Sequence, residues 1–266
     1  MRGRRRRKVG FWFRFAVMVL KPLLLVVTRR DWRGREHLPT EGGVVVCVNH
    51  ISYVDPLVLA HFLYDNGRLP RYLAKAGLFR LPLVGAVLRG AQQIPVHRES
   101  RDAAGAFRDA VAAVRRGECV VVYPEGTVTR DPGLWPMVGK TGAARIALST
   151  GAPVVPIAQW GAQRVLPPYA RRPRLWPPTL VHVTAGPPVE LTDLAGRELT
   201  AELLAEATER IMAALTALLE QIRGEAAPAT RFDVRRARLP RTGDPRRPAA
   251  SGEVRQPPSD GSAGAA

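Results

Sequence analysis

Residues 44–55 of this 266-residue chain read VVVCVNHISYVD, and the character of the sequence changes halfway along this stretch. The first five residues, 44–48, are apolar and mostly β-branched, which is typical of a strand buried in a sheet. Polar residues follow at once, among them His50 and Asp55. Because ligands in α/β proteins bind beyond the carboxyl ends of the strands, this stretch predicts a buried strand with a candidate site at its end.

Apolar runs and helical patterns alternate along the rest of the chain. Further strands are predicted at residues 72–74, 93–96, 119–123, 154–158 and 180–185. Helices are predicted at residues 56–64, 101–116, 141–150 and 199–223. Runs that are apolar throughout indicate strands covered on both faces, so the fold class is predicted to be α/β: a single domain with a mostly parallel central sheet flanked by helices.

The composition limits the classes of protein that need to be considered. The chain is 46% hydrophobic, as in a globular protein, and its net charge of +17 indicates an anionic partner: nucleic acid, anionic lipid or a phosphorylated substrate. Two cysteines exclude a disulfide scaffold and a four-cysteine zinc site. Both cysteines fall inside predicted strands, which favours buried, unreactive thiols, and no metal site is expected.

The N-terminal segment combines a basic cluster with an apolar stretch. Residues 1–8 hold six basic residues and no acid, and residues 10–28 are largely apolar. Arg14 and Lys21 interrupt the apolar stretch and Pro22 lies within it, which makes a membrane span costly. We therefore expect a helix that lies in the membrane interface, with a true span and a helix covering the core as the two alternatives.

These patterns divide the chain into three parts. We expect residues 1–30 to form a basic N-terminus with a membrane-anchoring helix, residues 31–224 to form the folded domain, and residues 225–266 to form a disordered basic tail. The tail holds eight arginines against five acids and has no sustained apolar period. It is either a solvated extension or an electrostatic tether to an anionic membrane.

His50 and Asp55 are the first candidates for chemistry. On a regular helix a separation of five residues would keep the two side chains apart. If His50 lies in the turn before the helix, Asp55 can reach back to the imidazole, fix its tautomer and leave the other nitrogen free as a base. The alternative is a core histidine beside an aspartate that stabilises the helix dipole.

A second polar segment, YPEGTVTR at residues 123–130, follows another predicted strand. Gly126 lets the backbone approach a ligand closely, and Thr127 and Arg130 are able to bind an anion. The alternative is a plain turn built by the proline and the glycine. Nucleophile-elbow, P-loop and dinucleotide-binding motifs are absent from the sequence, which disfavours a serine hydrolase and nucleoside phosphate chemistry.

Several blocks of the sequence occur in an order that resembles the glycerolipid acyltransferase family, especially its 1-acyl-sn-glycerol-3-phosphate acyltransferases. The blocks are N-H-x4-D (49–55), G-A-Q-Q-I-P-V-H-R (90–98), Y-P-E-G-T (123–127) and A-P-V-V-P-I (152–157), with A-K-x-x-L-F (74–79) and K-T-G (140–142) between them. The resemblance covers roughly residues 30–190. A lone H-x4-D is a weak signal, whereas four blocks in order form a specific one.

The resemblance implies a role for each matching residue. His50 would be the general base and Asp55 the residue that orients it. Arg98 and the segment Glu125-Gly126-Thr127 would bind the phosphate and polar head of the acyl acceptor, and Lys75 would add a further phosphate contact.

One position departs from the family pattern. Many members carry an arginine directly after E-G-T, whereas this chain has Val128 there and Arg130 two residues later. Arg130 is expected to substitute for that arginine, or else the acceptor differs from simple lysophosphatidate.

The function implied is the transfer of a fatty acyl group from acyl-CoA or acyl carrier protein to the free hydroxyl of a lysophospholipid. The expected acceptor is 1-acyl-sn-glycerol 3-phosphate, which gives phosphatidic acid; glycerol 3-phosphate or another lyso-lipid remains open. No cofactor or metal is expected, and the expected location is the cytoplasmic face of the cell membrane, as a peripheral or monotopic protein bound to its anionic surface. A basic protein that binds nucleic acid or anionic lipid without catalysis is the competing class, but nucleic-acid-binding signatures are absent from the sequence and no nucleic-acid partner is expected.

Overall fold

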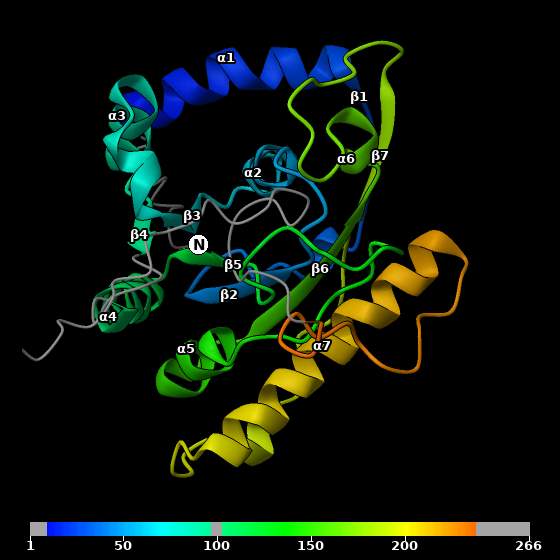
Figure 1. The fold of residues 1–266 in the computed structure, drawn as a ribbon. Coiled ribbons are helices and arrows are strands. Elements are labelled where there is room, and N and C mark those ends of the chain that lie inside the picture. Colours follow the sequence, from blue (N-terminus) through cyan, green and yellow to red (C-terminus); the bar gives the residue numbers. More distant parts are fainter. Residues whose placement is uncertain (1–9, 97–102, 238–266) are drawn as a thin grey trace, which may run out of the picture.

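The computed structural model of the chain describes residues 10–96 and 103–237 (Figure 1). Its strands form one sheet in the order β1-β7-β6-β2-β5-β3-β4. The strands are β1 (Thr28–Arg33), β2 (Val44–Val48), β3 (Pro70–Lys75), β4 (Ile94–Val96), β5 (Cys119–Val122), β6 (Val154–Trp160) and β7 (Thr179–Ala185). The helices are α1 (Phe11–Val27), α2 (Asp55–Asp65), α3 (Pro82–Gly90), α4 (Ala103–Arg115), α5 (Gly142–Thr150), α6 (Ala162–Val165) and α7 (Ala201–Arg223).

The sheet is mostly parallel. Strand β2 pairs in parallel with both β5 and β6, β5 pairs in parallel with β3, and β3 with β4. Strand β7 runs antiparallel to β6, and β1 runs parallel to β7, so this edge of the sheet is reversed. The predicted α/β domain with a mostly parallel central sheet flanked by helices is confirmed.

Both faces of the central strands are buried, which explains why their sequences are apolar throughout. Alternate residues of β2 point to opposite faces: Val45 and Cys47 join the cluster formed with α4, α5 and α7, whereas Val46 and Val48 join the cluster formed with α2. Both cysteines are free and buried, and burial raises the pKa of each thiol. The expectation that both cysteines are buried is therefore confirmed, and their low reactivity stays a prediction.

The edge strand β1 and the helix α3 were not predicted from the sequence. Strand β1 has the sequence TRRDWR, and its polar residues face solvent because an edge strand is covered only in part. It pairs residue by residue with β7, from Thr28 opposite Thr179 to Arg33 opposite Thr184. This strand runs through residue 30, where the sequence analysis placed a domain boundary.

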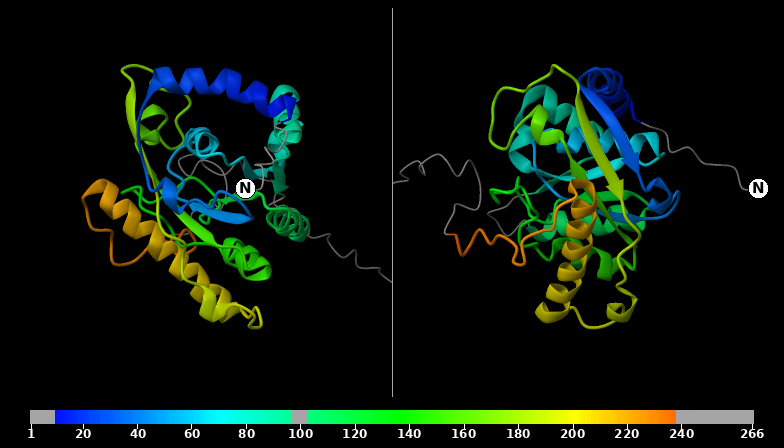
Figure 2. Two further views of the ribbon diagram at one scale, coloured as in Figure 1. Left: turned by 180° about the vertical axis from the view of Figure 1, so that it is seen from behind. Right: turned by 90° about the vertical axis from the view of Figure 1, so that its right-hand side faces the viewer.

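Helix α1 lies across one end of the molecule, above α2 and beside α3 (Figures 1 and 2). It is fixed near its C-terminal end, where Leu24 and Val27 are buried and Lys21 forms an ion pair of 2.6 Å with Asp65 of α2. Its outward side keeps large apolar residues such as Phe11 and Met18 exposed to solvent. Among the helices that the structure describes, none is long and apolar enough to cross a membrane.

The expected C-terminal tail is described as far as residue 237, and this part contacts the domain. The amide of Val138 donates a hydrogen bond to the carbonyl of Phe232, and Arg231 forms an ion pair with Glu209 of α7. The rest of the expected tail, like the basic cluster at residues 1–8, lies outside the described residues.

The pairing of β1 with β7 can be tested at Gly34, which directly follows β1. Gly34 has a φ of +71°, and an added Cβ would lie 1.8 Å from the carbonyl oxygen of Ala185. Gly42 is the matched control, because its φ is +76° and nothing lies within 4 Å of its added Cβ. We expect Gly42→Ala to lower the free energy of unfolding by about 1–2 kcal/mol, the usual cost of a left-handed L-residue. Gly34→Ala should cost clearly more in urea unfolding experiments; equal costs would contradict the observed packing of β1.

Candidate active site

The parallel strands bring the candidate residues to one edge of the sheet. Strands β2, β3 and β5 run in the same direction, so the polar segments that follow them meet at their carboxyl ends. Residues 49–55 follow β2, residues 123–130 follow β5, and Lys75 ends β3. Arg98 was predicted at the same edge, but it lies outside the described residues.

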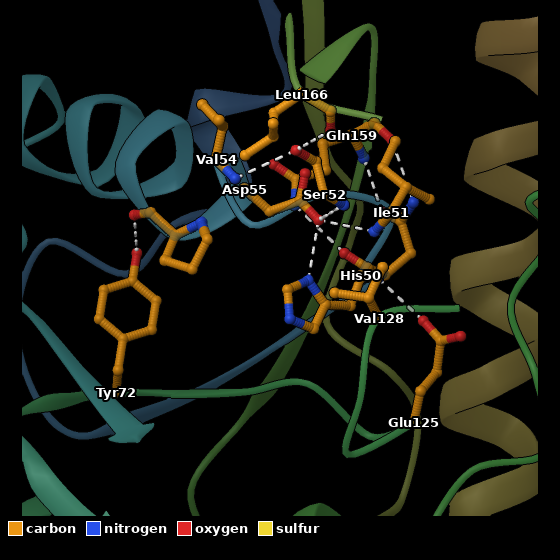
Figure 3. A network of polar contacts seen from close by, with 12 residues as sticks. His50, Ile51, Ser52, Val54, Asp55, Tyr72, Glu125, Val128, Gln159 and Leu166 are labelled. Atoms are coloured by element: carbon orange, nitrogen blue, oxygen red, sulfur yellow. Dashed lines mark hydrogen bonds and ion pairs between the residues drawn. The ribbon is translucent and has the colours of Figure 1, made fainter. Parts of the chain in front are cut away.

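His50 and Asp55 meet in the way that the turn geometry requires (Figure 3). His50 lies in the turn between β2 and α2, and Asp55 is the first residue of α2. The Nδ1 atom of His50 lies 2.9 Å from Oδ2 of Asp55. In the part of the chain that the structure describes, Nε2 of the same ring has no hydrogen-bond partner, and the histidine side chain is 14% exposed. The imidazole is therefore held at one nitrogen and open at the other.

The carboxylate of Asp55 organises the whole turn. Its Oδ2 atom also accepts hydrogen bonds from the backbone amides of Ile51, at 2.6 Å, and Ser52, at 2.7 Å. Asp55 is fully buried, and burial raises the pKa of its carboxyl, while the hydrogen bonds from His50, Ser52 and Ile51 act in the opposite direction. An acceptor facing Nδ1 selects the tautomer that carries its proton there, which leaves the lone pair on Nε2.

The backbone of His50 is fixed by the segment after β5. Its amide donates to Oε1 of Glu125 at 2.9 Å, and its carbonyl accepts a hydrogen bond of 2.7 Å from the amide of Thr129. The other oxygen of Glu125 accepts from the amide of Met137 at 3.0 Å. Burial raises the pKa of Glu125 to about 8. Glu125 was expected to contact the acceptor. Its carboxyl group instead lies inside the protein, where it joins the segment after β2 to the segment after β5.

Asn49 and Gln159 tie the turn to β6. The side-chain amide of Asn49 donates to the carbonyl of Gln159 at 3.0 Å and accepts from the amide of Gln159 at 2.8 Å. The Gln159 side chain in turn donates to the carbonyl of Asn49 at 3.2 Å. Both residues are buried, so these bonds hold the start of the histidine turn against the sheet without contact with solvent.

The predicted anion-binding residues occupy different environments. Gly126 has a φ of +72°, and an added Cβ would lie 2.5 Å from Nζ of Lys140, so this lysine lies across the glycine. Thr127 is partly exposed beside it, and Lys75 is exposed at the end of β3. Arg130 is buried rather than presented at the surface.

Lys140 was not predicted as a site residue, but its ammonium group lies beside Gly126. The K-T-G block was its signal, because that block follows Y-P-E-G-T in the sequence. The amide of Lys140 donates to the carbonyl of Pro124, which folds the chain back so that its side chain reaches Gly126. Among the described residues, no group of three or more His, Cys, Asp or Glu side chains is placed to hold a metal ion.

A row of aromatic rings leads from His50 to an apolar cavity. The ring of His50 stacks on Tyr123 at 4.2 Å, and Tyr123 lies parallel to Tyr72 at 6.4 Å. Tyr72 lines a cavity of about 180 Å³ between α1, α2 and α3, whose walls are almost entirely apolar. Its hydroxyl donates to the carbonyl of Pro56 at the start of α2, which fixes the ring at the cavity wall.

Comparison with known proteins indicates the family of the chain. The model of the family described as Acyltransferase matches residues 29–160. The chain is 30% identical over 152 residues to a 1-acyl-sn-glycerol-3-phosphate acyltransferase of Bacillus subtilis, a match that covers 56% of this chain and 71% of that protein. It is 37% identical over 151 residues to the protein of the same name from Borreliella burgdorferi, with 56% and 54% covered.

A solved structure shares the fold. The crystal structure of the 1-acyl-sn-glycerophosphate (LPA) acyltransferase PlsC from Thermotoga maritima has a TM-score of 0.59 and 22% identity to this chain, and the match covers 83% of this chain and 92% of that one. The chain spans about half the length of the Borreliella relative and about seven-tenths of the Bacillus relative. The match to the family model and the 30% identity to the Bacillus protein, 71% of which is covered, show that the chain belongs to the acyltransferase family.

Proposed function

We propose that the protein transfers a fatty acyl group to the free hydroxyl of 1-acyl-sn-glycerol 3-phosphate and so forms phosphatidic acid. The proposed acyl donor is acyl-CoA or acyl carrier protein, and the reaction needs no cofactor. The observation that carries the proposal is the imidazole of His50, which is held through Nδ1 by buried Asp55 while Nε2 remains open. Relatives named for this activity support the choice of acceptor.

The proposed mechanism is general-base catalysis. Nε2 of His50 takes the proton from the acceptor hydroxyl as its oxygen attacks the thioester carbonyl of the donor. A tetrahedral intermediate forms, its collapse releases the thiolate, and the proton held by His50 returns to that sulfur. Asp55 keeps the ring oriented and stabilises the imidazolium that forms during the transfer.

The acceptor phosphate is proposed to bind among the cations around His50. Lys75 and Lys140 reach this edge of the sheet from different segments, and an ammonium group binds phosphate without demanding a fixed geometry. Arg98 is assigned to the same task from the sequence alone. Val128, where the family pattern noted above has an arginine, is buried, and its apolar side chain offers no charge to a phosphate.

The apolar cavity below α1 is proposed to take the fatty acyl chain. Its lining includes Leu57 of α2, Tyr72 of β3, and Phe13 and Leu20 of α1. The aromatic row from His50 to Tyr72 joins this cavity to the reacting atoms. Since α1 also carries exposed apolar residues, we propose that the protein works as a peripheral protein on the cytoplasmic face of the cell membrane.

Replacement of His50 tests the mechanism. His50→Ala should lower kcat about 10²–10⁴-fold, the usual contribution of a general base, while the protein stays folded by circular dichroism. His182→Ala is the matched control, because His182 makes the same Nδ1 contact of 2.9 Å with Asp31 on the β1–β7 edge. The control should keep near-wild-type kcat; retention of wild-type activity in His50→Ala would contradict the proposed role.

A transfer assay with a panel of acceptors tests the proposed substrate. Purified full-length protein would receive a long-chain acyl-CoA and either 1-acyl-sn-glycerol 3-phosphate, glycerol 3-phosphate or lysophosphatidylcholine, with products read by mass spectrometry. Phosphatidic acid should form with the highest kcat/KM, because the cationic edge recognises a phosphate monoester, which lysophosphatidylcholine lacks, and because the relatives are named for 1-acyl-sn-glycerol 3-phosphate rather than for glycerol 3-phosphate. Faster acylation of either other acceptor would contradict the assignment.

A further inference from the structure

The loop between α6 and β7 combines positive charge with exposed apolar residues. This loop, residues 166–178, reads LPPYARRPRLWPP and is called the Arg–Trp loop below. It contains three arginines and no acidic residue. Arg171, Arg172 and Arg174 are exposed, and no hydrogen bond or ion pair engages their guanidinium groups within the described residues. Beside them, Trp176 is 79% exposed and Leu175 is 47% exposed.

The Arg–Trp loop lies at the same end of the molecule as α1. Where the loop enters β7, Thr179 pairs with Thr28, the residue that directly follows α1. Figures 1 and 2 show the loop rising beside the C-terminal end of α1 in views from different directions. The exposed apolar residues of α1, which include Met18 and Val26, therefore belong to the same end of the molecule as this loop.

The base of the same loop is bonded to both active-site segments. The hydroxyl of Ser52 donates to the carbonyl of Leu166 at 2.7 Å, and the hydroxyl of Tyr169 donates to the carbonyl of Val128 at 3.0 Å. The ring of Tyr169 also packs edge-on against Tyr53, which lies between His50 and Asp55 in the sequence. The loop thus connects the histidine turn directly to the end of the molecule that carries α1.

We propose that the Arg–Trp loop is a second membrane-contact site, separate from α1, that binds the surface of an anionic lipid bilayer. Tryptophan is favoured at the membrane–water interface, where its ring lies at the level of the headgroups. The three arginines would then lie at the lipid phosphates, where each basic residue strengthens binding to an anionic surface. A nucleic acid would use the arginines but leave Leu175 and the apolar side of α1 in water, so the bilayer is the better match.

This contact goes beyond the proposed acyl transfer, because it concerns only how the protein lies on a membrane. With α1 and the loop both in the interface, the protein has two separated contacts and a fixed orientation. The loop base at Ser52 and Val128 then places the histidine turn close to the membrane surface. A lipid acceptor has a short path from the bilayer to His50 in this orientation.

A site-specific fluorescent label tests the contact without any enzyme assay. Both native cysteines are buried, so Leu175→Cys introduces the accessible thiol that an environment-sensitive nitrobenzoxadiazole reagent would label. Leu199→Cys is the matched control, because Leu199 is 37% exposed just before the N-terminal end of α7, at the far end of the molecule from α1. The label is read after addition of vesicles made of phosphatidylcholine and phosphatidylglycerol, under conditions in which sedimentation shows the protein bound.

The proposal expects a blue shift and stronger emission at position 175 and an unchanged spectrum at position 199. An unchanged spectrum at 175 on bound protein, or equal changes at both positions, would overturn it. Because the readout needs no turnover, its outcome is independent of whether the proposed acyl transfer is correct.

Removal of charge gives a second test. The triple variant Arg171→Gln, Arg172→Gln and Arg174→Gln should bind phosphatidylglycerol-containing vesicles at least about tenfold more weakly than the wild type, since each arginine contributes severalfold. The control variant replaces three exposed arginines on other surfaces with glutamine: Arg108, Arg145 and Arg197. Its net charge equals that of the loop variant. Equal weakening in both triple variants, or a loop variant that loses duplex DNA binding but retains vesicle binding, would overturn the proposal.

Discussion

One carboxylate oxygen organises the turn of the candidate active site. Oδ2 of Asp55 accepts hydrogen bonds from the amides of Ile51 and Ser52 and contacts Nδ1 of His50. The same atom therefore sets the path of the backbone at the start of α2 and the direction of the imidazole. Since Asp55 is fully buried, its contacts are protected from competition by water, and the histidine is oriented before any substrate binds.

Around this turn, buried polar bonds join segments that are far apart in the sequence. Glu125 holds the amide of His50, and Asn49 forms three hydrogen bonds with Gln159. These residues face each other and the backbone, so they fix the position of the histidine turn. The buried apolar sheet supports these segments, and the segments after its strands carry the candidate site residues.

The central strands could be predicted from the sequence because burial on both faces leaves continuous apolar runs, as in residues 44–48. The His50–Asp55 contact could also be predicted. A turn before the helix brings two side chains that are five residues apart in the sequence into contact, whereas a regular helix keeps them apart. Strand β1 could not be predicted, because an edge strand with a polar sequence lacks that signal and depends on its pairing with β7. The inward position of Glu125 depends on the amide of Met137, which no local pattern reveals.

The proposed mechanism requires Asp55 to hold the ring of His50 so that Nε2 is the free base. The most direct measurement is nitrogen NMR spectroscopy of protein labelled in its histidine rings, with the His50 signals identified by their loss in His50→Gln. The account predicts that the neutral ring carries its proton on Nδ1 in the wild type, as the 2.9 Å contact with Asp55 requires. A neutral His50 ring protonated on Nε2 would contradict it.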